Sequence, residues 1–248
     1  MTLVLRADCI GKSYGRQKVL GAATLRASAG EVTYLVGRNG CGKTTLLRVA
    51  AGTLAADTGV VFFRGRPILR PRWHRLARQG LAYLPDRELL APGRTVRDHL
   101  ETVARQLRRP GYAGVVDSCA VGPLLDRQCG GLSEGERRRA EVAAVLAGGP
   151  ACLLADEPYR NLDPADREII AGALRQAARQ GCAVIVTGHE VETLLAASDR
   201  VVWCTDGTTY ELGTVREALG HWRFIGTYVG PARAGRMLAA PGSGDREA

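Results

Sequence analysis

One eight-residue segment constrains the fold more than any other part of the sequence. It matches G-x-x-x-x-G-K-[ST] and consists of Gly37, Arg38, Asn39, Gly40, Cys41, Gly42, Lys43 and Thr44. The β-rich run 31–36 precedes it, and the helical pattern 43–51 follows it. A glycine-rich loop between a strand and a helix presents backbone N–H groups and the positive end of the helix dipole, which together attract phosphate. The motif in this context predicts a phosphate-binding P-loop.

The rest of the chain alternates β-rich runs with helical patterns. The run 183–187 precedes a helical pattern at 190–197, and the apolar run 153–155 ends in two acidic residues. Such alternation predicts an α/β fold with a mainly parallel core sheet. Between residues 86 and 147 helical patterns replace the strand signals, with Thr95 as the expected N-cap of helix 96–108 and Ser133 as that of helix 134–147. This part of the chain is expected to be a helical insertion.

The length of 248 residues favours one domain over two. We expect this domain to cover residues 1–230. Its predicted parts are a core made of 1–85 and 148–215, a helical subdomain 86–147 and a C-terminal helical tail 216–230. The end of the chain, 231–248, is rich in small and polar residues and is expected to be a flexible tail.

Composition narrows the function classes. No run reaches the about 18 to 20 apolar residues that cross a bilayer, and the first residues do not have the pattern of a secretory signal. These two observations predict a cytoplasmic location. In that reducing compartment, seven cysteines without a C-x-x-C pair are expected to form neither disulfides nor a structural zinc site. The net charge of +9 fits either a solvated basic surface or an acidic partner such as lipid head groups or nucleic acid. The arginine-rich stretch at 64–78 is either a solvated basic face or a surface next to acidic lipid head groups.

Adjacent carboxylates at the end of the run 153–155 predict the chemistry. Asp156 suits a Mg²⁺ shell, through water, because Mg²⁺ is a hard ion that keeps part of its hydration. Glu157 can act as the general base for a water that attacks the γ-phosphate. Lys43 is expected to reach the β- and γ-phosphates, and the Thr44 hydroxyl to bind Mg²⁺. Taken alone, an Asp-Glu pair could instead cap a loop.

Four further motifs occur in order along the chain. They are Tyr14 in Lys12-Ser13-Tyr14-Gly15, the segment Leu132-Ser133-Glu134-Gly135-Glu136, the segment Asn161-Leu162-Asp163, and His189. With the P-loop and the acidic pair, they make the chain resemble ATP-binding-cassette ATPases over residues 3 to 215. The resemblance implies a P-loop NTPase fold with an N-terminal antiparallel β region and a helical insertion.

The resemblance also implies roles for these residues. Tyr14 would stack on adenine, Thr45 would join the P-loop in binding nucleotide, and His189 would be the switch histidine that acts with Glu157 and Lys43 in catalysis. The signature segment, through Ser133, Gly135 and Glu136, would contact the γ-phosphate held by the opposite subunit. Ser133 and Glu136 also form a capping-box pattern, so the same residues would start a helix without any ligand.

Partners follow from the same resemblance. Such ATPases bind ATP and Mg²⁺ between two head-to-tail subunits, so this chain would pair with a copy of itself or with a related subunit. A separate membrane permease would hold it at the cytoplasmic face of the cell membrane, and no nucleic acid is expected. Two alternatives are a soluble single-cassette ATPase that acts in assembly or repair, and an ATP-binding switch with little hydrolysis.

The switch alternative depends on one departure from the pattern of the family. After the run 81–85, the resemblance predicts glutamine, but the chain has Asp86. An aspartate keeps an oxygen ligand, but it is shorter, charged and without a donor when ionised. Either Asp86 binds Mg²⁺ directly with near-normal turnover, or it displaces the attacking water and slows hydrolysis. Glu134 and Glu136 stand where glycine and glutamine are commoner, and neither predicts inactivity.

Overall fold

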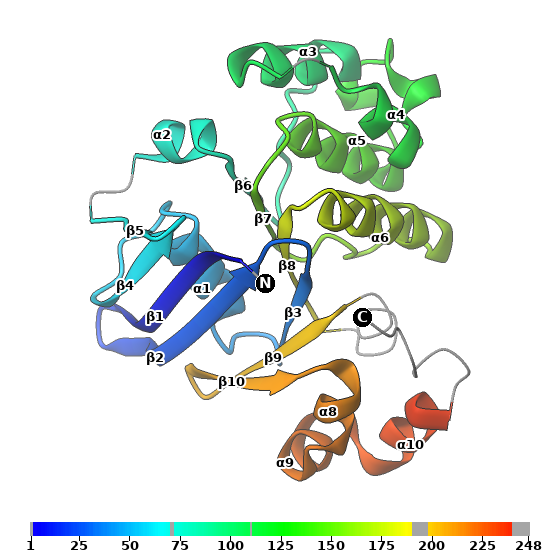
Figure 1. The fold of residues 1–248 in the computed structure, drawn as a ribbon. Coiled ribbons are helices and arrows are strands. Elements are labelled where there is room, and N and C mark those ends of the chain that lie inside the picture. Colours follow the sequence, from blue (N-terminus) through cyan, green and yellow to red (C-terminus); the bar gives the residue numbers. More distant parts are fainter. Residues whose placement is uncertain (1, 70–71, 110, 190–197, 240–248) are drawn as a thin grey trace.

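The computed structural model describes residues 2–69, 72–109, 111–189 and 198–239 (Figure 1). In these ranges an antiparallel sheet and a mainly parallel sheet adjoin, with a helical region beyond one end of the parallel sheet (Figure 1). The predicted helix at 190–197 lies outside the described residues. The fold class predicted from the sequence is confirmed.

The antiparallel sheet is built by the first third of the chain. In the order β2-β1-β4-β5, its strands are β2 Gln17–Ser28, β1 Leu3–Tyr14, β4 Thr58–Phe63 and β5 Arg66–Pro67. Leu5, Ala7 and Ile10 of β1 are fully buried, whereas Arg6 and Asp8 between them remain partly accessible and form an ion pair. One face of this sheet therefore packs on the core and the other faces solvent.

The six-stranded sheet carries the P-loop. In the order β10-β9-β3-β8-β7-β6, its strands are β10 Thr208–Gly213, β9 Arg200–Thr205, β3 Val32–Val36, β8 Ala183–Gly188, β7 Cys152–Ala155 and β6 Leu81–Leu84. Neighbouring strands from β9 to β6 are parallel, and β10 is antiparallel to β9. Every residue of β3, β7 and β8 is buried, which explains their continuous apolar runs.

Helices cover the parallel sheet and form the insertion. In chain order they are α1 Lys43–Ala50, α2 Trp73–Arg78, α3 Val96–Gln106, α4 Ala113–Ser118, the 3₁₀ turns η1 Gly122–Leu124 and η2 Cys129–Gly131, α5 Glu134–Leu146 and α6 Pro164–Arg179. Thr95 and Ser133 cap α3 and α5 through complete capping boxes, as predicted. In Figure 1, α3, α4 and α5 lie together at the top of the molecule.

The C-terminal segment lies at the opposite end of the molecule (Figure 1). It consists of α8 Val215–Gly220, α9 Trp222–Phe224, the π-helical turn η3 Ile225–Val229 and α10 Pro231–Ala239. Residues 231–248 were expected to form a flexible tail. The structure differs at 231–239, because Pro231 begins a helix whose Ala234 is buried. No helix among the described residues has the length and apolar character needed to cross a membrane.

Candidate nucleotide site

The P-loop connects β3 to α1. Gly42, at the N-cap of α1, has a φ of 106°, and a Cβ there would collide with Leu20, so only glycine fits this position. Lys43 is buried, and its ammonium group donates to the carbonyls of Gly37 at 2.7 Å and Arg38 at 3.1 Å. The lysine charge therefore lies within the loop, beside the N–H groups of the start of α1.

A cavity of about 430 Å³ opens at this loop. Eleven residues line it, namely Val19, Asn39, Gly40, Gly42, Lys43, Thr44, Thr45, Asp86, Glu157, Arg160 and His189. Residues predicted from four distant parts of the sequence thus meet around one space, because parallel strands deliver their following loops to the same edge of a sheet. Tyr14 does not belong to this lining; it is the last residue of β1 and is 45% exposed.

Asp156 is fully buried next to Thr44, which lines the cavity. Its carboxylate accepts hydrogen bonds from Thr44 at 3.1 Å, Thr187 at 2.8 Å and Tyr83 at 3.3 Å. Burial raises the pKa of Asp156, and the hydroxyl donors oppose this rise. A hydroxyl and a carboxylate side by side are the hard oxygen ligands that suit Mg²⁺. Thr187 and Tyr83 were not singled out from the sequence.

Glu157 and His189 face each other. The imidazole Nδ1 lies 3.3 Å from Oε2 of Glu157, and the backbone N–H of Glu157 donates to the Thr187 hydroxyl at 2.8 Å. Glu157 has a φ of 46°, a backbone conformation that a non-glycine residue rarely adopts and that concentrates at functional sites. Thr187 therefore orients both acidic residues, Asp156 through its carboxylate and Glu157 through its main chain.

Asp86 enters the cavity beside an arginine. The guanidinium of Arg160 lies 3.9 Å from the Asp86 carboxylate, and the two side chains are 56% and 40% exposed. Asp86 is the departure from the pattern of the family that the sequence shows after the run 81–85. The positive charge of Arg160 partly offsets the charge that aspartate adds at this position, although solvent screens the pair.

The signature segment lies apart from this cavity, at the exposed start of α5. Glu136 donates its backbone N–H to Ser133, its carboxylate accepts the Ser133 N–H at 2.8 Å, and Arg127 pairs with the same carboxylate at 2.6 Å. A Cβ at Gly135 would overlap the Asp166 carboxylate, which explains the glycine. None of Ser133, Gly135 and Glu136 lines the cavity in one copy of the chain.

Arg138 links α5 to the acidic pair and was not predicted as a site residue. Its buried guanidinium donates to the carbonyls of Pro85, Asp156, Glu157 and Pro158 at 2.8 to 3.3 Å, and to the Glu141 carboxylate at 2.9 Å. Glu141 also accepts the N–H of Leu89. One side chain thus holds together the segments that carry Asp86 and Glu157.

Cys41 is expected to react with alkylating agents in a pH-dependent way. A hydrogen bond from the Cys204 thiol, assisted by the charge of Lys43 and opposed by burial, lowers the pKa of Cys41 to about 7. Below this pH the thiol is protonated, so the rate of iodoacetamide labelling should fall about tenfold per pH unit, and above it the rate should level off. Mass spectrometry of the labelled peptide measures the rate.

Bound ATP should protect Cys41, because the residue belongs to the phosphate loop. The exposed Cys9, on β1, is the internal control, since nucleotide should leave its labelling unchanged. Equal labelling of Cys41 with and without ATP, or a rate that does not change across pH 6 to 8, would contradict the prediction.

Comparisons with known proteins agree on one family. The sequence model of the family described as ABC transporter matches residues 20–160. The chain is 31% identical over 223 residues to the lipopolysaccharide export system ATP-binding protein LptB of Acidithiobacillus ferridurans, which covers 88% of this chain and 92% of that protein. It is 32% identical over 224 residues to the Fe(3+) ions import ATP-binding protein FbpC 2 of Rhodococcus jostii, covering 88% of this chain and 64% of the relative.

Solved structures show the same fold. A nucleotide-free ATP-binding cassette from an ABC transporter superposes with a TM-score of 0.80 at 22% identity, over 92% of this chain and all of that one. A cassette in its ADP conformation gives 0.79 at 22% identity, over 93% of this chain. The family match covers more than half of the 248 residues. The chain therefore belongs to the ABC transporter family, as one of its nucleotide-binding ATPase subunits.

Proposed function

We propose that this chain binds and hydrolyses Mg-ATP at a head-to-tail dimer interface and thereby drives a separate membrane permease. The main observation behind this proposal is that the P-loop, Asp86, Glu157 and His189 line one cavity. A nucleotide-binding loop alone would serve kinases and switches equally well. A carboxylate and an imidazole 3.3 Å apart, facing the same space, add the groups that hydrolysis requires.

The residues of the cavity divide the chemistry among them. Lys43 would exchange its contacts with the loop carbonyls for the β- and γ-phosphates, and Glu157 would accept the proton of the attacking water, with His189 beside the γ-phosphate. Thr44 and Asp156 would hold Mg²⁺, since they form an adjoining pair of oxygen ligands. When bound, the metal ion neutralises charge on the phosphates.

A second subunit is proposed because one copy leaves the site incomplete. Ser133 and Gly135 lie at the exposed start of α5, a helix of 13 residues whose N–H groups and dipole suit a phosphate. In a head-to-tail dimer, this helix start would close the cavity of the opposite subunit. The exposed ring of Tyr14 would then be available to adenine, which supports the role proposed for it.

The permease is proposed to dock beside the helical insertion. A second cavity of about 260 Å³ lies between α2, β6, α3 and α5, and apolar side chains dominate its lining, including Trp73, Leu89 and Val103. Trp73 and Leu89 are 37% and 43% exposed and line the same apolar groove, and an exposed apolar groove of this kind marks a protein interaction site. The named relatives serve export of a lipopolysaccharide and import of Fe(3+), so we propose that the permease selects the cargo.

Steady-state hydrolysis of Mg-ATP by the purified chain, followed together with its oligomeric state, tests this proposal. Turnover with ATP-dependent dimerisation supports it, and co-purification then identifies the permease. Absence of ATP hydrolysis, whether or not ATP still binds, would overturn it.

Asp86→Gln is expected to weaken the response to Mg²⁺. If the carboxylate contributes to holding the metal ion, its neutral replacement should raise the Mg²⁺ concentration for half-maximal hydrolysis about three- to tenfold, the loss of about 1 kcal/mol at a partly exposed position. Turnover at saturating ATP and Mg²⁺ should stay near that of the wild type. A Mg²⁺ titration of initial rates measures both quantities. A higher turnover at every Mg²⁺ concentration would instead show that Asp86 obstructs the attacking water.

A further inference from the structure

The C-terminal turn η3 contacts both sides of the nucleotide site. From the P-loop side, the Arg38 guanidinium donates to the Thr227 carbonyl at 3.2 Å. On the other side, the Tyr228 hydroxyl donates to the carbonyl of His189 at 3.3 Å. Two consecutive residues of the tail therefore join the loop that holds phosphate to the residue that faces Glu157.

A stack of aromatic rings fixes the position of Tyr228. The Tyr228 ring stacks on Phe224 with centroids 5.5 Å apart, and Phe224 meets Trp203 of β9 edge-on at 5.6 Å. Phe224 is fully buried, and Trp203 pairs in register with Val36, the last residue before the P-loop. The segment 224–229 is thus anchored to β9, the strand beside β3, which precedes the P-loop. The Tyr228 hydroxyl therefore has a defined place relative to the site.

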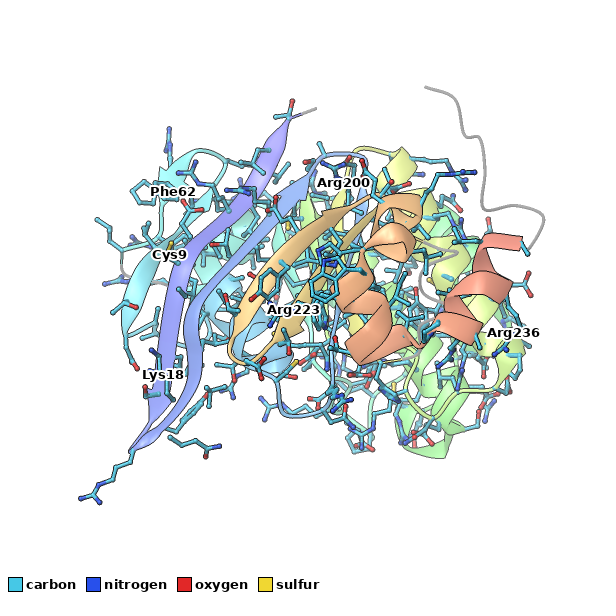
Figure 2. The ribbon with its side chains drawn as sticks, turned by 90° about the horizontal axis from the view of Figure 1, so that it is seen from below. Cys9, Lys18, Phe62, Arg200, Arg223 and Arg236 are labelled. Atoms are coloured by element: carbon cyan, nitrogen blue, oxygen red, sulfur yellow. The ribbon has the colours of Figure 1, made fainter. Side chains whose placement is uncertain are left out.

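Arg223 adds a second anchor on the outer side of this stack. Its guanidinium lies 6.0 Å from the ring centroid of Trp203 and 5.4 Å from that of Tyr210. Figure 2 shows Arg223 lying against β9 and β10, where the C-terminal helices meet the sheet. The aromatic stack is therefore held by packing and by cation–π contact, independently of the Tyr228 hydroxyl.

The surroundings of Tyr228 keep its hydroxyl protonated. Burial, followed by the negative charges of Cys41 and Glu157, raises the pKa of Tyr228 to about 12. A tyrosine with this pKa remains a hydrogen-bond donor throughout the range in which an ATPase works. The His189 carbonyl therefore keeps the Tyr228 hydroxyl as its hydrogen-bond donor throughout this pH range.

We propose that Tyr228 is a positioning residue for ATP hydrolysis, which acts on His189 through the main-chain carbonyl of His189. The hydrogen bond between Arg38 and Thr227 holds η3 against the P-loop. This inference rests on the proposed function. The direction of the His189 side chain follows from its backbone, so a fixed carbonyl limits how the imidazole meets Glu157 and the γ-phosphate. Loss of the donor should impair the chemical step more than the binding of ATP.

Tyr228→Phe tests the proposal, because it removes the hydroxyl and keeps the ring in the stack. We expect kcat to fall about fivefold, the loss of one net hydrogen bond, with less than about a twofold change in KM for ATP. Tyr210→Phe is the matched control: Tyr210 lies near the same stack and accepts a hydrogen bond from Arg223, outside the site. Its kcat and KM should equal those of the wild type.

A second measurement separates positioning from general weakening. In a His189→Ala background, Tyr228→Phe should have no further effect on kcat, because the residue on which it acts has lost its imidazole. An unchanged kcat in Tyr228→Phe, or an equal loss in both backgrounds, would overturn the positioning role alone. A wild-type chain that binds ATP without hydrolysing it would overturn the proposed function first, and the wild-type rate distinguishes this outcome.

Discussion

Replacement of Glu157 by glutamine is expected to lower the rate of ATP hydrolysis by about two to four orders of magnitude, the usual contribution of a general base. The amide has nearly the shape of the carboxylate but cannot take a proton from water. The main-chain bond from Glu157 to Thr187 does not involve the side chain, so the local fold should persist. ATP binding should remain, and without hydrolysis the ATP-bound dimer should accumulate.

Light scattering with and without ATP, beside a phosphate-release assay, measures both effects. Lys43→Ala is the informative comparison, because it removes the charge within the P-loop and should abolish ATP binding, hydrolysis and dimerisation together. A Glu157→Gln variant that still hydrolyses ATP at a tenth of the wild-type rate or more would contradict the assignment of this residue as general base.

Arg138→Met is expected to lower the free energy of unfolding by about 3 to 5 kcal/mol, the range found when one partner of a buried ion pair is removed. The Arg138 and Glu141 side chains are only 10% and 4% exposed, so the remaining carboxylate would stay buried without its countercharge. Four backbone carbonyls would also each lose one donor. Hydrolysis should fall too, because the segments bearing Asp86 and Glu157 would lose their common support.

Urea unfolding followed by circular dichroism gives the change in free energy. Arg137→Met is the matched control on the same helix, since Arg137 pairs at 3.1 Å with Glu88, which is 69% exposed. A pair so accessible to solvent should contribute at most about 1 kcal/mol. Equal destabilisation by the two substitutions would show that Arg138 is an ordinary surface cation in solution.

The parts of the site that the sequence predicts are those whose functional groups are neighbours in the chain. The P-loop works through successive backbone N–H groups, so its glycines and Lys43 must be neighbours in the chain as well as in space. The capping boxes at Thr95 and Ser133 are local for the same reason, and the structure contains both. The alternation of apolar runs and helical patterns predicts the layers because burial on both faces of a parallel sheet requires it.

The parts that the sequence leaves hidden depend on distant partners. Arg138 donates to carbonyls 18 to 53 positions away, and a main-chain carbonyl has no signature in a sequence. In the sequence, Thr187 looks like any β-branched strand residue. Its role is seen only in the structure, where it hydrogen-bonds to both Asp156 and Glu157. The helix that begins at Pro231 was missed because small and polar residues beyond it dominate the composition of that segment.

The hydrogen bonds of Arg138 have a consequence for which side chains the fold tolerates at position 86. Apart from Glu141, the hydrogen-bond acceptors of the guanidinium among the described residues are main-chain oxygens, which every amino acid supplies. The segment after β6 is held through the carbonyl of Pro85, whatever side chain follows. Evolution can therefore exchange glutamine for Asp86 without loosening the scaffold. Substitutions at position 86 are therefore expected to change the proposed chemistry of the site and to leave the free energy of unfolding nearly unchanged.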